Sequence, residues 1–145
     1  MDELLLLCAS PKGEQSVSFE CLKMLEDYIQ KKKGTAALLC LQGAQERELA
    51  ERVLSCGRVV IAFPTLVAAP PAGLLRFLAL LDERIAAGQP GRPKVYLIVH
   101  GGALEAKEQD MAVALVRGFC RRAGLCDRVA LQIGSGDLIL GTPFR

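Results

Sequence analysis

Five short aliphatic runs alternate with longer amphipathic segments, and this alternation is the feature that most restricts how the chain can fold. The runs are apolar at nearly every position, which is typical of strands buried on both faces. Strands separated by helices form parallel sheets with helices packed on both sides. The sequence therefore predicts an α/β fold. The five predicted strands are Leu4 to Cys8, Ala36 to Leu41, Arg58 to Phe63, Lys94 to Val99 and Arg128 to Ile133.

The segments between these runs have the residue spacing of amphipathic helices. The expected helices run from about Ser16 to Gly34, Gln45 to Cys56, Pro71 to Gly88 and Glu105 to Ala123. The residues predicted to face inward are Val17, Cys21, Met24, Leu25 and Tyr28, then Leu49, Val53 and Leu54, then Leu74, Leu78, Leu81 and Ile85, and finally Met111, Leu115 and Phe119. No full helix is predicted after the fifth strand.

Size and composition narrow the class of protein. The chain has 145 residues, so we expect one domain over residues 1–145, and its net charge of +2 gives no reason to expect nucleic acid as a partner. We expect neither a secretory signal nor a membrane span, because acidic residues open the chain and every apolar run is short. The six cysteines form no C-x-x-C pair, which favours free thiols in the cytoplasm. With a single histidine, a metal site is not expected.

The first run ends in a small polar loop with the composition of a phosphate-binding site. Ser10, Ser16 and Ser18 can donate hydroxyl hydrogen bonds, and Lys12 adds a positive charge. A loop at the carboxyl end of a strand also presents the N–H groups of the following helix to an anion. The same residues fit other roles, since Ser16 and Ser18 are good helix caps and Lys12 suits a solvated loop. The loop predicts a phosphate-bearing ligand without identifying it.

Three segments together resemble the small NAD(P)H-dependent FMN reductases of the flavodoxin-like superfamily. Ser10-Pro11-Lys12 followed by Ser16-Val17-Ser18 resembles the phosphate loop of that family. Phe63 to Leu66, followed by Pro71 and Gly73 to Leu78, resembles its second signature, in which a strand ends in P-x-Y and a helix opens with P-x-x-[LF]-K-x-[FW]. Val99 to Gly102 occupies the position of its third ligand loop. The match covers nearly the whole chain.

The resemblance implies a three-layer flavodoxin-like fold, with a five-stranded parallel sheet of order 2-1-3-4-5 and a last helix that is short or missing. It implies FMN as cofactor, NAD(P)H as electron donor, a small-molecule electron acceptor and a homodimer. The flavin would carry the chemistry, so no side chain is implied as an acid or base. The residues implied in cofactor binding are Ser10, Lys12, Ser16, Val17, Ser18, Pro64, Thr65, Leu66, Val67, His100, Gly101 and Gly102.

Two positions depart from the family pattern. Leu66 replaces the aromatic residue that lies against the flavin, and Val17 replaces an asparagine. An aromatic contact is worth roughly 0.5–1.5 kcal/mol beyond its burial, so the first departure predicts weaker stacking on the ring.

Two other functions remain open. One is a flavodoxin-like domain without cofactor that serves as a binding or assembly module. The other is phosphotransfer on Cys8, as in the EIIB domains of sugar transport, whose cysteine also precedes a phosphate-binding loop; Cys8 equally fits a buried core. The related phosphatase pattern is excluded because Glu14 stands where an arginine is required, and a carboxylate repels phosphate. His100 also fits a surface turn without a ligand.

Overall fold

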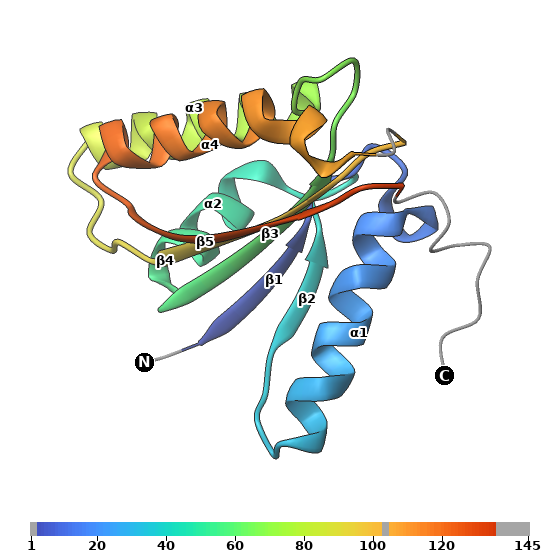
Figure 1. Ribbon diagram of the computed structural model, residues 1–145. Coiled ribbons are helices and arrows are strands. Elements are labelled where there is room, and N and C mark those ends of the chain that lie inside the picture. Colours follow the sequence, from blue (N-terminus) through green and yellow to red (C-terminus); the bar gives the residue numbers. More distant parts are fainter. Residues whose placement is uncertain (1–2, 103–104, 136–145) are drawn as a thin grey trace.

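The sheet has five parallel strands in the order β2-β1-β3-β4-β5. The computed structural model describes residues 3–102 and 105–135. Figure 1 shows α1 on one face of the sheet and α2, α3 and α4 on the other. The predicted flavodoxin-like arrangement and strand order are confirmed. The strands are β1 (Leu4–Cys8), β2 (Ala37–Cys40), β3 (Arg58–Pro64), β4 (Lys94–His100) and β5 (Cys126–Ile133).

All four predicted helices form. They are α1 (Val17–Lys31), α2 (Glu46–Ser55), α3 (Ala72–Ala86) and α4 (Asp110–Ala123), with short 3-10 turns η1 (Gly13–Gln15) and η2 (Ala106–Gln109) before α1 and α4. Within the residues that the structure describes, none of these helices is long and apolar enough to cross a membrane. The segment predicted to hold a short or missing last helix, residues 136–145, lies outside the described residues.

The predicted end of the first helix is wrong in detail. Gly34 was expected to close it, but α1 ends at Lys31 and the residue with left-handed backbone is Lys33, at φ +62°. The Gly34 N–H donates to the Ile29 carbonyl at 2.9 Å. The chain therefore closes the helix with hydrogen bonds to its last carbonyls, although a lysine takes the position that glycine usually fills.

The larger core lies between the sheet and α2, α3 and α4. Phe63 of β3 and Phe77 of α3 are fully buried in it, together with Leu5 and Leu7 of β1. The inward residues predicted for α2 and α3 are confirmed as core residues, and Ile85 packs against them partly buried. These two helices repeat their apolar residues in one clear stripe, so the sequence identifies the buried face correctly.

The inward face predicted for α4 is wrong at Met111 and Leu115, whereas the third predicted residue, Phe119, packs partly buried against the large core. Met111 is 72% exposed and Leu115 is also exposed, whereas the smaller Ala112, Val113, Val116 and Cys120 are buried. The observed rotation of α4 places its arginines beside β5. Arg117 Nε lies 2.9 Å from Asp127 Oδ1, and a second arginine, Arg121, contacts the same carboxylate. The sequence of α4 has two similar apolar stripes, one with Met111 and Leu115 and one with Val113 and Val116. In the structure the second stripe is buried, and the ion pairs with Asp127 form in this orientation of the helix.

The smaller core lies beneath α1. Leu22 packs on Leu6 and Cys8 of β1 and on Val60 and Ala62 of β3. Met24 and Tyr28, predicted to face inward, are exposed instead, while Leu25 is partly buried. A single helix has only one face to bury on the sheet, so part of the apolar surface of α1 stays outside the core.

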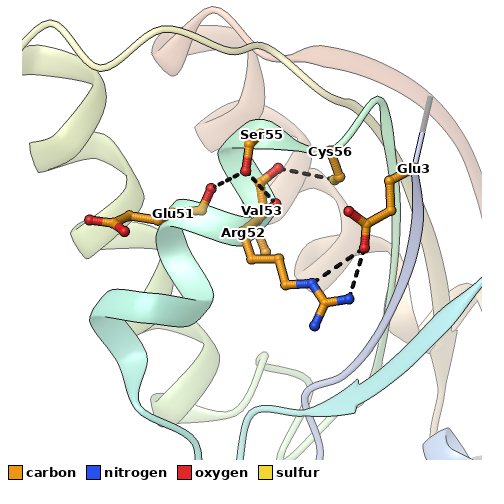
Figure 2. A network of polar contacts seen from close by, with 6 residues as sticks. All are labelled: Glu3, Glu51, Arg52, Val53, Ser55 and Cys56. Atoms are coloured by element: carbon orange, nitrogen blue, oxygen red, sulfur yellow. Dashed lines mark hydrogen bonds and ion pairs between the residues drawn. The ribbon is translucent and has the colours of Figure 1, made fainter. Parts of the chain in front are cut away.

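Polar contacts close the end of the sheet opposite the strands' carboxyl ends. Arg52 of α2 reaches Glu3, with Nη2 and Glu3 Oε1 2.9 Å apart (Figure 2). The N–H groups of Gly57 and Arg58 donate to the Glu3 carbonyl. The Cys56 thiol donates to the Val53 carbonyl at 3.0 Å, and burial raises the pKa of this thiol to about 11. These contacts tie the connection from α2 into β3 to the residue that precedes β1.

Candidate functional site

The loops after β1, β3 and β4 meet at the carboxyl end of the sheet, next to the start of α1 (Figure 1). They enclose a cavity of about 330 Å³, which lies within the usual size range of small-molecule sites. The cavity is lined by Ser10, Pro11, Lys12, Gln15, Ser16, Val17, Pro64, Thr65, Leu66, His100, Gly101 and Gly102. The structure thus brings together all the predicted site residues except Ser18 and Val67.

The phosphate loop is built around Ser16, the N-cap of α1. The Ser16 hydroxyl donates to the Gly13 carbonyl at 2.6 Å and accepts from the Phe19 N–H at 3.1 Å. The Ser10 hydroxyl oxygen accepts from the Lys12 N–H at 3.2 Å, and its O–H donates to no group that the structure describes. The helical-cap role considered for Ser16 is therefore present in the structure.

Backbone groups at the start of α1 add further donors to this loop. The first N–H groups of a helix have no acceptor inside the helix. The Phe19 N–H is satisfied by Ser16, and the N–H groups of Val17 and Ser18 stand in the same turn without an intrahelical acceptor. Lys12 is exposed at the rim of the cavity. An anion at this point would meet helix N–H groups and an ammonium group.

Cys8 lies beneath the phosphate loop. It is fully buried, with Sγ 3.6 Å from the Gly13 carbonyl oxygen and 3.5 Å from Ser16 Oγ. A nucleophilic thiol needs access to the phosphorus atom that it attacks. The geometry gives Cys8 a packing role under the loop and does not support phosphotransfer.

Ser18 and His100 form a buried pair behind the cavity. Ser18 Oγ and His100 Nε2 are 2.6 Å apart, with Ser18 fully buried and His100 4% exposed. A serine beside a histidine is also the arrangement of an activated nucleophile. Here the hydroxyl is buried and does not line the cavity, so the pair serves to hold the imidazole in place. Sequence reasoning placed both residues at the site but did not foresee that they contact each other.

The loops after β3 and β4 are tied together. The Thr65 N–H donates to the His100 carbonyl at 2.8 Å. A Cβ on Gly101 would lie 2.5 Å from Thr65 Oγ1, which is closer than real contacts allow. A larger residue at position 101 would therefore have to displace the Thr65 hydroxyl, which shows how closely the two loops approach each other.

A tight turn follows β3 and carries Leu66 into the cavity wall. The Leu66 N–H donates to the Ala69 carbonyl at 2.7 Å, and the Ala69 N–H donates back at 3.1 Å. Val67 and Ala68 have φ values of +50° and +63°, the sign that a type I′ turn needs at both central residues. Leu66 is 47% exposed, and Val67 stands at the tip, fully exposed and away from the cavity. A valine with positive φ is uncommon, so this turn holds strain beside the site.

Gln109 supports the loop after β4 and was missed from the sequence. Its side chain is buried, and Nε2 donates to the Ile133 carbonyl at 2.6 Å. A Cβ on Gly101 would lie 3.6 Å from the same nitrogen. Gln109 therefore packs behind the glycine turn and links it to the end of β5. A lone glutamine in a polar segment gives no sequence signal for such a role.

Metal binding has no support in the described part of the chain. Among residues 3–102 and 105–135, no three His, Cys, Asp or Glu side chains are grouped so that they could hold a metal ion.

No protein-family model and no curated protein matches this sequence. Solved structures do match. The general stress protein 14 of Treponema denticola, in complex with FMN, superposes with a TM-score of 0.67 at 16% identity over 96% of both chains. The NADPH-quinone reductase of P. pentosaceus gives 0.66 at 14% identity, over 92% of this chain and 85% of that one. The flavodiiron protein of Giardia intestinalis gives 0.65 at 14% identity, over 97% of this chain and 33% of that one. Together with the strand order, these likenesses show that the chain has the flavodoxin-like fold.

Proposed function

We propose that this protein binds FMN and passes electrons from NAD(P)H through the flavin to a small acceptor. The observation that carries the proposal is the cavity between the start of α1 and the loops after β3 and β4, which gathers the residues that the family resemblance implies. The fold shared with an FMN complex and an NADPH-quinone reductase supports it. We further propose a cytoplasmic homodimer made of single-domain chains.

The residues present fit both parts of FMN. The N–H groups of Val17 and Ser18 and the ammonium group of Lys12 would hold the phosphate. The apolar side chain of Leu66 and the small turn at Gly101 and Gly102 would lie beside the ring. Lys12 and Leu66 are exposed at the cavity, so a ligand can reach them without any change in the core.

When bound, FMN would supply the electron-transfer chemistry, and the chain's own groups would position it. The imidazole of His100, held by Ser18, forms a polar part of the cavity wall near the ring-side loops. Thr65 and Gly101 keep these two loops close together. The protein would thus provide a preformed cavity whose polar side chains are held in place by contacts within the chain.

A module without cofactor is the second candidate, and one observation favours it. The hydroxyl groups of Ser16 and Ser18, both expected to contact the phosphate, are already hydrogen-bonded within the chain. The phosphate would then depend on backbone N–H groups, Lys12 and the Ser10 hydroxyl.

Titration with FMN and riboflavin separates the two candidates. Wild-type protein should bind FMN and gain thermal stability from it. Lys12→Ala should weaken FMN binding about fivefold, as expected for one exposed ion pair of about 1 kcal/mol, and leave riboflavin binding unchanged. Lys31→Ala, at the far end of α1, is the matched control and should change neither. A wild-type melting temperature that ignores excess FMN would establish the cofactor-free module instead.

A further inference from the structure

A second cavity of about 310 Å³ lies next to the first, and the two share the loop residues Ser10 and Pro11. The second cavity is formed by the end of β1, the loop between β2 and α2, and the start of α3. Its lining residues include Leu41, Ala44, Glu46, Pro71, Gly73 and Arg76. None of the cofactor-binding residues considered above belongs to it except Ser10.

Two opposite charges line this second cavity without pairing. Arg76 and Glu46 are both exposed, and neither forms an ion pair with any described residue. A Cβ on Gly73 would lie 3.7 Å from Arg76 Nη2, so the guanidinium lies back over the first turn of α3. Other exposed arginines of the described chain, such as Arg52 and Arg121, do pair with carboxylates. The charges of the second cavity therefore remain available to a ligand.

The donor set matches a ribonucleotide. A guanidinium binds phosphate oxygens in a bidentate manner, and a carboxylate accepts hydrogen bonds from the two hydroxyls of a ribose, as acidic residues do in dinucleotide sites. Leu41, Ala44 and Pro71 add apolar surface for a base. A ribonucleotide has one group for each of these three features: a phosphate for the guanidinium, a ribose for the carboxylate and a base for the apolar surface.

We propose that the second cavity binds the adenosine phosphate half of the reductant, with Arg76 on phosphate and Glu46 on the ribose diol. The proposal rests on the proposed function, in which a pyridine dinucleotide is the electron donor. A dinucleotide bound across the Ser10–Pro11 loop would bring its nicotinamide end toward the cavity proposed for FMN. Because the Glu46 carboxylate repels a 2′-phosphate, the site selects NADH over NADPH.

The test uses the full chain with saturating FMN and 5′-AMP as the probe, measured by calorimetry. Wild-type protein should bind 5′-AMP without displacing FMN. Arg76→Ala should weaken 5′-AMP binding about tenfold through loss of a bidentate phosphate contact, with FMN affinity unchanged. Glu46→Gln should weaken 5′-AMP binding, strengthen binding of adenosine 2′,5′-bisphosphate and lower the KM for NADPH relative to NADH. Both side chains are exposed, and melting temperatures check that the variants fold.

Neighbouring charges on α2 provide matched controls. Arg47→Ala and Glu48→Gln change exposed side chains that do not line the second cavity, and they should leave 5′-AMP affinity unaltered. Equal behaviour of the four variants, or displacement of FMN by 5′-AMP, would overturn the inference. Failure of the proposed function looks different: FMN then fails to bind the wild-type chain, while 5′-AMP still binds and still depends on Arg76.

Discussion

The two faces of the sheet differ in what is buried on them. The face under α2, α3 and α4 buries a continuous apolar core that contains Phe63 and Phe77. The face under α1 buries only a small apolar cluster, and at its carboxyl end lie the buried polar residues Ser16, Ser18 and His100. Apolar burial is the main stabilising contribution to folding, so the first face holds the fold together. The second face carries the buried polar residues, and the cavity lies at its carboxyl end.

This division predicts that core and site can be damaged separately. Changes in the large core should lower stability without altering ligand affinity in the molecules that remain folded. Changes in the polar residues under α1 should alter both.

Among single substitutions, the largest effect is expected from Phe77→Ala. Removal of a fully buried phenylalanine leaves a cavity and should cost about 3–5 kcal/mol in the free energy of unfolding, measured by urea denaturation. FMN affinity at low temperature should be unchanged. Leu75→Ala, on the exposed side of the same helix, is the control and should cost much less. A folded Phe77→Ala protein with weakened FMN binding would contradict the separation of core and site.

Alkaline pH should weaken the large core through its buried thiols. Burial raises the pKa of Cys56 and of Cys120 from 9.0 to about 11. In the unfolded chain these thiols ionise above pH 9, whereas in the folded protein they keep their protons up to about pH 11. The contribution of these two protonated thiols to the free energy of unfolding is therefore fully present below pH 9. It is lost as pH rises from 9 to 11, by about 1.4 kcal/mol per pH unit for each thiol.

Thermal unfolding across this pH range measures the effect. A variant that carries both Cys56→Ala and Cys120→Ala should lose stability less steeply with pH than the wild type. If the two slopes are the same, these thiols do not set the alkaline limit.

Ser18→Ala tests the polar side of the comparison. The change removes the hydrogen bond to His100 Nε2 inside the protein and should cost about 1–3 kcal/mol. It should also weaken FMN binding, because the imidazole loses the group that holds it at the cavity. A double-mutant cycle with His100→Ala isolates the pair, and additive effects would show that the contact carries no coupling energy.

The smallest effect is expected from Val67→Gly, and this substitution should raise the free energy of unfolding, whereas the others lower it. Glycine adopts the positive φ of position 67 without steric cost, so the variant should gain about 1 kcal/mol or less. FMN affinity should stay close to wild type, since Val67 does not line the cavity. Loss of stability in this variant would mean that the exposed valine side chain makes a contact worth more than the strain.

Local pattern was enough to predict the framework. The five strands, the four helices and the buried faces of α2 and α3 follow from runs and spacings that the sequence displays directly. The loop from Ser10 to Val17 was also found from its composition, because a cap, a glycine and small hydroxyl residues occur together at a strand end. Each of these features depends on residues that are neighbours in the sequence.

Contacts between distant segments decided the rest. Ser18 and His100 are separated by 82 positions, and only the packing of α1 across the end of β4 brings them together. The buried face of α4 was ambiguous because Met111 and Val113 belong to two similar apolar stripes. The structure buries the stripe with Val113, and in this orientation α4 forms an ion pair with β5. The pairing of Gln109 with Ile133 and the close approach of Gly101 to Thr65 likewise exist only after the sheet has formed. The sequence alone thus determined the helices and strands and their order along the chain. The tertiary structure decided which polar groups are hydrogen-bonded inside the protein and which remain able to bind a ligand. The reason is that hydrogen bonds and close contacts depend on distances in space, which no spacing along the chain specifies.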